Sequence, residues 1–243
     1  MVWKNPYLDA VLVPAGQILM VAYHLRLIYR VRNDPLNTVI GVNQVNRRAW
    51  VNFIMQDGKG NGVLGVQTIR NSIMASTLLA STAITLSSLI GALVTGNSSG
   101  KASNLIVGSH DNTILQVKYL SLLICFFLAF VCHVQAIRYS SHVSFLISIP
   151  MGDNAPGLSP EYVNRLLHRS TNFFSLGLRA YYFSFPLLLW LFGPIPQFAC
   201  ALVMVLFLNI VDTAKEFKLT LSTVEEAKIY LSHASEKSDG AVV

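Results

Sequence analysis

The chain has 243 residues, of which 53% are hydrophobic and only 12% are charged, and its formal net charge is +6. Soluble domains carry about 25% charged residues, so this composition excludes an ordinary soluble domain and indicates a membrane protein. The basic residues are unevenly distributed along the chain. This pattern indicates how the chain is oriented in the membrane, rather than that it binds nucleic acid.

The first apolar segment is predicted to cross the membrane over residues 8–29. Aromatic and basic residues follow at its end, including Tyr29, Arg30 and Arg32, and membrane–water interfaces attract both types. The segment is too long for the core of a signal peptide, and no small-residue cleavage site follows closely. We therefore expect it to be retained.

A long polar connection joins this segment to the next one. Residues 37–56 within it have amphipathic character and are expected to form a helix at the headgroup level, with Asn37 as its N-cap. The glycine-rich residues 57–62 are expected to form a turn, because the Gly-Lys-Ser/Thr ending of a phosphate-binding loop is absent.

The second predicted span, residues 72–94, contains no charged residue and is long enough to cross a bilayer, which takes about 20 apolar residues. We expect its helix to begin before the membrane, near Val63, so that Gln67, Arg70 and Asn71 lie at a cytoplasmic mouth. The many hydroxyl and small residues of this span indicate neighbours other than lipid.

On a helical wheel at about 100° per residue, these polar and small residues separate into two stripes. The first stripe consists of small residues that allow another helix to approach closely: Ser72, Ser76, Ala80, Ala83, Ser87 and Gly91. The second stripe carries the hydroxyls of Thr77, Ser81, Thr85 and Ser88. Such hydroxyls either bond back to carbonyls one turn earlier or line a water-filled path, where they replace part of an ion's hydration shell.

A third span is predicted over residues 113–137, in a helix that extends to residue 147. Ser159, Pro160 and Glu161 then predict the start of a cytoplasmic helix. They supply a cap, a proline in the first turn and an acid near the positive end of the helix dipole.

The last apolar region, residues 181–211, is interrupted by Pro186 and by a Gly-Pro-Ile-Pro run at residues 193–196. It forms either one kinked span or two half-spans in a hairpin, and we favour the kinked span. Residues 216–243 are predicted to form a polar C-terminal tail, which leaves residues 1–215 as one transmembrane domain with four spans.

The connections on one side of the second and third spans hold most of the basic residues, so the positive-inside rule assigns that side to the cytoplasm. The N-terminus then lies outside or in a lumen, and Asp9, Asp111 and Asp212 fall at the outer edge. In an oligomer these aspartates would form an acidic ring that attracts cations. Asp9 and Asp111 are equally favourable as helix-start residues.

The sequence contains no paired carboxylates within a span and no Cys/His spacing of a metal site. We therefore expect no enzyme, no metal and no cofactor. Cys125, Cys132 and Cys200 lie in predicted spans and are expected to pack as small apolar residues. Lys118 is expected to extend toward the outer interface, and His133 to form hydrogen bonds near the inner one.

Two elements carry a resemblance to a known family. They are Arg-Arg-Ala-Trp-Val at residues 47–51, and Gln-Thr-Ile-Arg-Asn-Ser-Ile-Met-Ala-Ser-Thr at residues 67–77, followed by Leu-Ala-Ser-Thr-Ala-Ile at residues 79–84. With these elements the chain resembles the plant branch of the membrane family DUF599, over most of its length up to about residue 215. The resemblance implies a multi-span membrane protein of unassigned function, with its working site at the start of the second span.

Together these features predict an all-α, polytopic transmembrane helical bundle with long cytoplasmic helix extensions, in the plasma membrane or an endomembrane. The expected function is a homo-oligomeric ion channel with a Ser/Thr-lined path on the second span. Its expected partners are membrane lipids, further copies of the chain and small inorganic ions, and no nucleic acid. The alternatives are a non-conducting membrane scaffold or signalling protein, and a small-solute transporter supported only by the break at residues 193–196.

Overall fold

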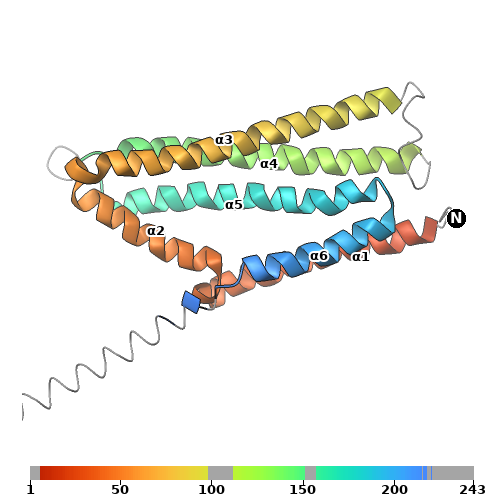
Figure 1. Ribbon diagram of the computed structural model, residues 1–243, viewed down its shortest axis with the longest axis horizontal. Helices are drawn as coiled ribbons and strands as arrows, with labels where there is room; N and C mark the ends of the chain where they lie inside the picture. The colour runs from red at the N-terminus through yellow and green to blue at the C-terminus, as the bar shows by residue number, and fades with distance from the viewer. Residues whose placement is uncertain (1–5, 98–111, 151–156, 215, 218–219, 221–243) are drawn as a thin grey trace, which may run out of the picture.

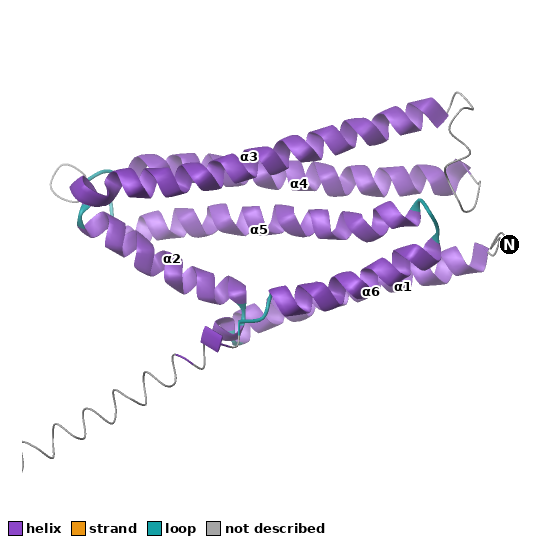
Figure 2. Ribbon diagram, viewed as in Figure 1, coloured by secondary structure: helices purple, strands orange, loops and turns teal. Residues whose placement is uncertain are grey.

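The computed structural model describes residues 6–97, 112–150, 157–214, 216–217 and 220. Within these residues the chain forms six α-helices and one short 3-10 helix, and no strand (Figure 2). The predicted all-α class is therefore confirmed.

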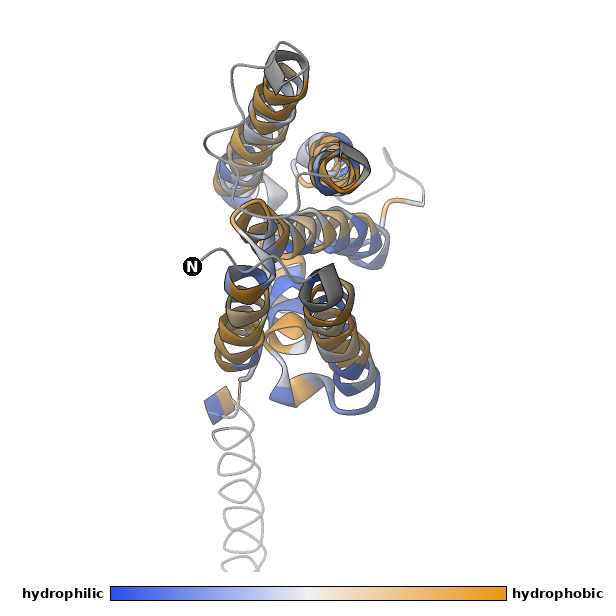
Figure 3. Cartoon of the chain, turned by 90° about the vertical axis from the view of Figure 1, so that its right-hand side faces the viewer, coloured by the Kyte–Doolittle hydropathy of each residue, from blue (hydrophilic) through white to orange (hydrophobic). Residues whose placement is uncertain are grey.

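The helices follow one another as α1 (Pro6–Asn33), η1 (Pro35–Asn37), α2 (Val39–Gln56), α3 (Gly58–Asn97), α4 (Asn112–Leu146), α5 (Pro160–Trp190) and α6 (Pro194–Val211). Four of them, α1, α3, α4 and α6, are long and apolar enough to cross a membrane. Figure 3 shows apolar residues along the shafts of these helices. The chain is therefore an integral, multi-pass membrane protein.

The long helices lie in three layers (Figure 1). α3 and α4 form one outer layer, α5 lies in the middle, and α1 and α6 form the other outer layer. α2 runs obliquely across one end of the bundle, from the end of α1 to the start of α3. Since α3 packs mainly on α4 and α2, much of its surface is left uncovered by the rest of the chain.

α5 carries the chain from one end of the bundle to the other, because α4 ends and α6 begins at opposite ends (Figure 1). A turn at residues 191–193 joins α5 to α6, and its Gly193 has φ 141°, a conformation that glycine adopts most readily. Residues 181–211 therefore form a hairpin and not the kinked span that we favoured. Gly193 lies in the turn between α5 and α6, and residues 194–196 form the first turn of α6. The Gly-Pro-Ile-Pro run is therefore not an interruption within one spanning helix, which was the feature that suggested a transporter.

The two ends of the bundle differ in length and charge. α6 has 18 residues and is about 27 Å long, close to the hydrocarbon thickness of about 30 Å. α3, α4 and α5 have 40, 35 and 31 residues and project past α6 at the end where α2 lies (Figure 1). This projecting part carries Arg47, Arg48, Arg138, Arg165 and Arg169, so the positive-inside rule assigns it to the cytoplasm.

Side-chain caps fix two helix starts in this cytoplasmic part. The hydroxyl of Ser159 accepts a hydrogen bond from the backbone N–H of Tyr162 at 3.2 Å, as the sequence predicted for the start of α5. α2 is capped by Thr38, whose hydroxyl accepts from the N–H of Gly41 at 3.2 Å, and not by the predicted Asn37.

α3 begins at Gly58, immediately after α2, so most of the turn predicted at residues 57–62 is helical. The carboxylate of Asp57 accepts a hydrogen bond from the N–H of Gly60 at 3.0 Å, which satisfies a free donor at the helix start. A Cβ at Gly60 would lie 2.4 Å from this carboxylate. The glycine thus leaves room for the cap, and α3 starts earlier than the predicted Val63.

Apolar side chains fill the spaces between the layers. The cytoplasmic part has a cluster from α2, α3, α4 and α5 that includes Val51, Ile54, Ile69, Val143, Ile147 and Val163. A second cluster joins α3, α4 and α5 through Ala83, Ile90, Leu122, Phe126, Ala180 and Leu187. A third joins α1 and α6 through Met20, Ala201 and Leu208. The interior of a single chain is therefore largely apolar.

Candidate functional site

The hydroxyl stripe of α3 lies on the side that the rest of the chain leaves uncovered. All four of its members are exposed: Thr77, Ser81, Thr85 and Ser88. In the neighbouring small-residue stripe, Ser76, Ala80 and Ala83 are buried, Ser87 and Gly91 are half-buried, and Ser72 is exposed. The small residues thus face the bundle, whereas the hydroxyls face away from it.

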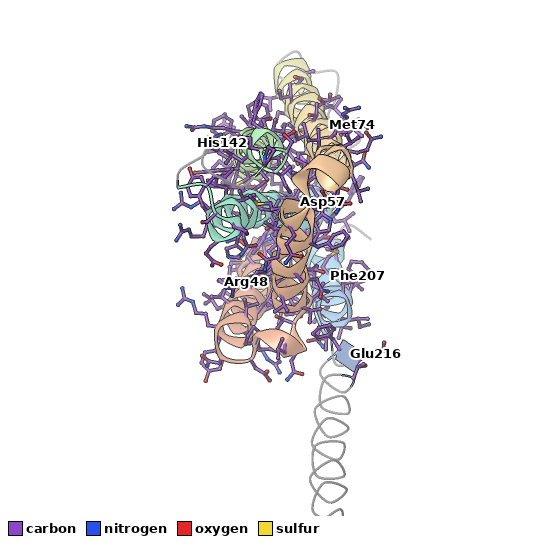
Figure 4. The ribbon with its side chains drawn as sticks, turned by 90° about the vertical axis from the view of Figure 1, so that its left-hand side faces the viewer. Arg48, Asp57, Met74, His142, Phe207 and Glu216 are labelled. Carbon is purple, nitrogen blue, oxygen red and sulfur yellow. The ribbon has the colours of Figure 1, made fainter. Side chains whose placement is uncertain are left out.

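Exposed residues continue the hydroxyl stripe toward the cytoplasm. At steps of three or four residues, which keep to one helix face, the sequence reads Gln67, Arg70, Met74, Thr77, Ser81, Thr85 and Ser88, and all of these are exposed. Met74 lies on the side of α3 away from α4 (Figure 4). We call these seven residues the hydroxyl line. Two predicted mouth residues, Gln67 and Arg70, belong to it, and Asn71 is exposed beside it.

The hydroxyls of this line are only partly used within the helix. Thr77 Oγ1 donates to Ile73 O and Thr85 Oγ1 donates to Ser81 O, each at 2.9 Å, which is the back-bonded arrangement. In the part of the chain that the structure describes, the side chains of Ser81 and Ser88 make no hydrogen bond. Their hydroxyls are therefore free to bind water, an ion or another chain.

Of the aspartates predicted for the outer edge, Asp9 and Asp212 lie in the described residues, and they lie at opposite ends of the bundle. Asp9 lies at the outer end, where its Oδ1 accepts a hydrogen bond from Trp190 Nε1 at 3.3 Å. Asp111 lies outside the described residues. Asp212 lies at the cytoplasmic end of α6, because α5 returns the chain across the bundle before α6 begins (Figure 1).

Asp212 accepts the hydrogen bonds of a buried cluster that joins three helices. Arg179 donates through Nη2 to Oδ1 at 2.9 Å and through Nη1 to Oδ2 at 3.2 Å, and the hydroxyl of Tyr23 donates to Oδ2 at 2.7 Å. This two-pronged geometry fixes α5, α6 and α1 relative to one another. This cluster was not predicted from the sequence. The available signal was that Arg179 and Asp212 flank the apolar region 181–211, since a hairpin brings its two ends together.

Lys118 is buried and does not extend to the outer interface as expected. Its Nζ lies 5.4 Å from the ring centroid of Trp190, a distance at which a cation is attracted to the face of an aromatic ring. Trp190 thus contacts Lys118 through its ring and Asp9 through its Nε1. These three residues join α4, α5 and α1 at the outer end.

His133 is buried between α4 and α5. Its ring packs edge-on against Phe174, with 5.4 Å between the ring centroids. Neither ring nitrogen has a hydrogen-bond partner among the described residues, so the expected hydrogen bonding is not found there. Gly177 lies against this ring, because a Cβ built at that position would be 2.8 Å from Nε2.

We expect Gly177→Ala to destabilise the protein by about 1–3 kcal/mol, because the added methyl group overpacks the contact with His133. The measurement is the thermal unfolding midpoint of purified protein in detergent. In a His133→Ala background the same substitution should destabilise less, since the obstructing ring is gone. An equal loss in both backgrounds would contradict this contact.

The two sequence elements that carry the family resemblance meet at one pocket of about 380 Å³ between α2, α3 and α5. Arg47 and Trp50 line it from α2, and Thr68, Ile69 and Ser72 line it from α3. The hydroxyl line and this pocket therefore occupy different faces of the same part of α3. These are the two candidate sites of the chain.

A family model described as "Protein of unknown function, DUF599" matches residues 11–217. The match reaches from the second turn of α1 past the end of α6, so it includes all or most of every helix of the bundle. It concerns the family as a whole and does not distinguish a plant branch. Neither the curated proteins nor the solved structures contain a significant match to the chain.

Proposed function

We propose that this chain, which belongs to the DUF599 family, assembles into a homo-oligomer that conducts small inorganic ions. The proposal is carried by one observation, which is that the hydroxyl line of α3 is exposed along its whole length. Hydroxyls at regular spacing on one helix face can replace part of an ion's hydration shell. In a lone chain they would instead face lipid tails, which offer them no hydrogen bonds.

The path would lie between copies of the chain, because the interior of one copy is filled by apolar clusters. Cyclic symmetry would repeat α3 around a central axis, so that each copy contributes one hydroxyl line. Large apolar side chains flank the line, and Leu78, Ile84 and Leu89 are 70%, 49% and 56% exposed. These side chains supply the contact surface between copies or with lipid.

The charge at the cytoplasmic end of the hydroxyl line bears on ion preference. Asp212, one of the aspartates predicted to attract cations, pairs with Arg179 at the cytoplasmic end. Arg70 is the exposed charged residue on the line itself. Repeated around an axis, Arg70 would form a ring of positive charge, and such rings favour anions.

The experiment is ion flux in liposomes reconstituted with purified protein of known oligomeric state. We expect Thr85→Leu to lower flux about tenfold or more, because it replaces a hydroxyl on the path with a larger apolar side chain. Assembly, measured by light scattering in detergent, should be unchanged.

The exposed Arg70 predicts that Arg70→Gln lowers anion permeability relative to cation permeability.

Thr82→Leu is the matched control. Thr82 is also exposed and also back-bonded, with Oγ1 donating to Leu78 O at 2.8 Å, but it lies about 100° around the helix from the centre of the hydroxyl line. Flux through Thr82→Leu should equal that of the wild type. A stable oligomer without flux would favour the scaffold alternative, and equal flux in both variants would remove the hydroxyl line from the path.

A further inference from the structure

Seven of the nine residues that line the pocket between α2, α3 and α5 have side chains with hydrogen-bond donors. Its volume is about 380 Å³, and its lining is Asn43, Asn46, Arg47, Trp50, Thr68, Ile69, Ser72, Leu167 and Thr171. No carboxylate is among these residues. A pocket with many donors, one cation and no acidic side chain is suited to an anion.

Arg47 is the charged residue of this pocket, and it differs from two other arginines of the chain. Arg48 pairs with Glu161 at 3.0 Å, and Arg179 pairs with Asp212 at 2.9 Å. In the described part of the chain, Arg47 has neither an ion pair nor a hydrogen bond, although burial lowers the pKa of its guanidinium. Placing an unpaired charge in a half-buried site is unfavourable, and a bound anion would compensate it.

Further donors surround Arg47 from two helices. The side-chain amides of Asn43 and Asn46 and the hydroxyl of Ser72 make no hydrogen bond within the described residues. Thr68 Oγ1 already donates to Leu64 O at 2.9 Å, so it adds an acceptor rather than a donor. The guanidinium, two amides and one hydroxyl can together contact several oxygens of a single ligand.

The position of the pocket along α3 sets its depth in the membrane. Ser72 is the first residue of the second predicted span, residues 72–94, which contains no charged residue, and Thr68 lies one turn before it on the cytoplasmic side. Trp50 is half-buried in the same pocket, and tryptophan favours the headgroup level of a bilayer. The pocket therefore opens where the lipid phosphates of the cytoplasmic leaflet lie.

We propose that this pocket binds a phosphate monoester, with Arg47 as the charged anchor and Asn46 and Ser72 as hydrogen-bond donors. Two sources present this group at the pocket, the headgroup of a phosphomonoester lipid and a soluble phosphate. The planar guanidinium of arginine binds two phosphate oxygens at once through paired N–H groups. The site does not depend on the ion path, because its lining residues Thr68 and Ser72 lie off the hydroxyl line.

The test uses the full chain in two settings. In detergent, inorganic phosphate is titrated while the thermal midpoint is followed. In nanodiscs of phosphatidylcholine, the same measurement is made with phosphatidic acid or with phosphatidylserine, a phosphodiester lipid, as the minor component. Stabilisation by inorganic phosphate assigns the site to a soluble ligand. If phosphatidic acid stabilises the protein more than phosphatidylserine does, and inorganic phosphate has no effect, the site is assigned to a lipid.

Arg47→Gln should weaken the apparent Kd about tenfold or more, the effect of losing a hydrogen bond to a charged group. Arg48→Gln is the matched control, since Arg48 is adjacent on α2 but exposed (Figure 4), and it should leave the Kd unchanged. If Arg47→Gln does not fold, Ser72→Ala should weaken binding several-fold. No stabilisation from either source, equal stabilisation by the two lipids without any effect of inorganic phosphate, or equal losses in Arg47→Gln and Arg48→Gln would overturn the proposal.

Discussion

Asp212→Ala should lower the thermal midpoint of the purified protein by about 6–12 °C. Removing one partner of a buried ion pair destabilises a protein by about 3–5 kcal/mol. The side chains of Arg179 and Asp212 are 16% and 10% exposed, which favours the lower end of that range. A loss of about 3 kcal/mol shifts the midpoint of a chain of this size by about 2–4 °C per kcal/mol.

The large effect has a specific structural cause. Without the carboxylate, the guanidinium of Arg179 loses both of its acceptors and the hydroxyl of Tyr23 loses its only one. Those donors lie on α5 and α1, so the loss loosens the junction of the middle layer with the α1–α6 layer. The main chain of Asp212 still accepts from the N–H of Val39 at 3.1 Å. The substitution therefore removes the side-chain cluster and keeps the link to α2.

Arg48→Ala provides the comparison within the same chain. Arg48 and Glu161 form an ion pair of similar length, 3.0 Å, but their side chains are 61% and 52% exposed. Exposed pairs contribute about 0–1 kcal/mol because water screens the charges. The midpoint should change little in this variant. Equal shifts in Arg48→Ala and Asp212→Ala would contradict the assignment of a structural role to the buried cluster.

The sequence predicted the membrane class and the helices of the chain but not the path of α5. Hydropathy finds a helix whose average over about 20 residues is strongly apolar, as in α3 and α6. α5 carries Arg165, Arg169 and Arg179, so its average is too polar, although Val163, Leu166 and Ala180 on its other face are buried. A helix in the middle layer meets its neighbours on several sides and can carry polar groups toward them. The error in α5 then moved Asp212 to the wrong end.

For the candidate sites too, the sequence predicted what depends on positions within one helix, but not what depends on contacts between helices. The wheel separated the small-residue stripe of α3 from its hydroxyls, because helical periodicity fixes which residues share a face. It did not reveal which helix packs on the small-residue stripe, since that depends on the position of α4. In the same way, the two family elements could be recognised separately. Their meeting at one pocket depends on α2 folding back along α5 and α3, which no local pattern encodes.

Gly41→Ala should destabilise the protein by about 3 kcal/mol or more, through a clash that no side chain can relieve. A Cβ at Gly41 would lie 2.1 Å from the carbonyl oxygen of Pro35 and 2.6 Å from its carbonyl carbon. That oxygen already accepts from the N–H of Thr38 at 3.0 Å and from its hydroxyl at 2.8 Å. The backbone of η1 would have to move away, which breaks the turn that sets α2 across the bundle and exceeds the usual 1–3 kcal/mol of overpacking.

Gly91→Ala is the matched control, because a Cβ at Gly91 would meet no heavy atom within 4 Å. Glycine within a helix is less favourable than alanine by about 1 kcal/mol, so this variant should keep or raise the thermal midpoint measured in the same detergent. The two substitutions add the same methyl group, but their effects on the thermal midpoint should have opposite signs. If Gly41→Ala also left the midpoint unchanged, the close approach of α2 to Pro35 would be excluded. The fixed crossing of α2, which forms one wall of the pocket between α2, α3 and α5, would be excluded with it.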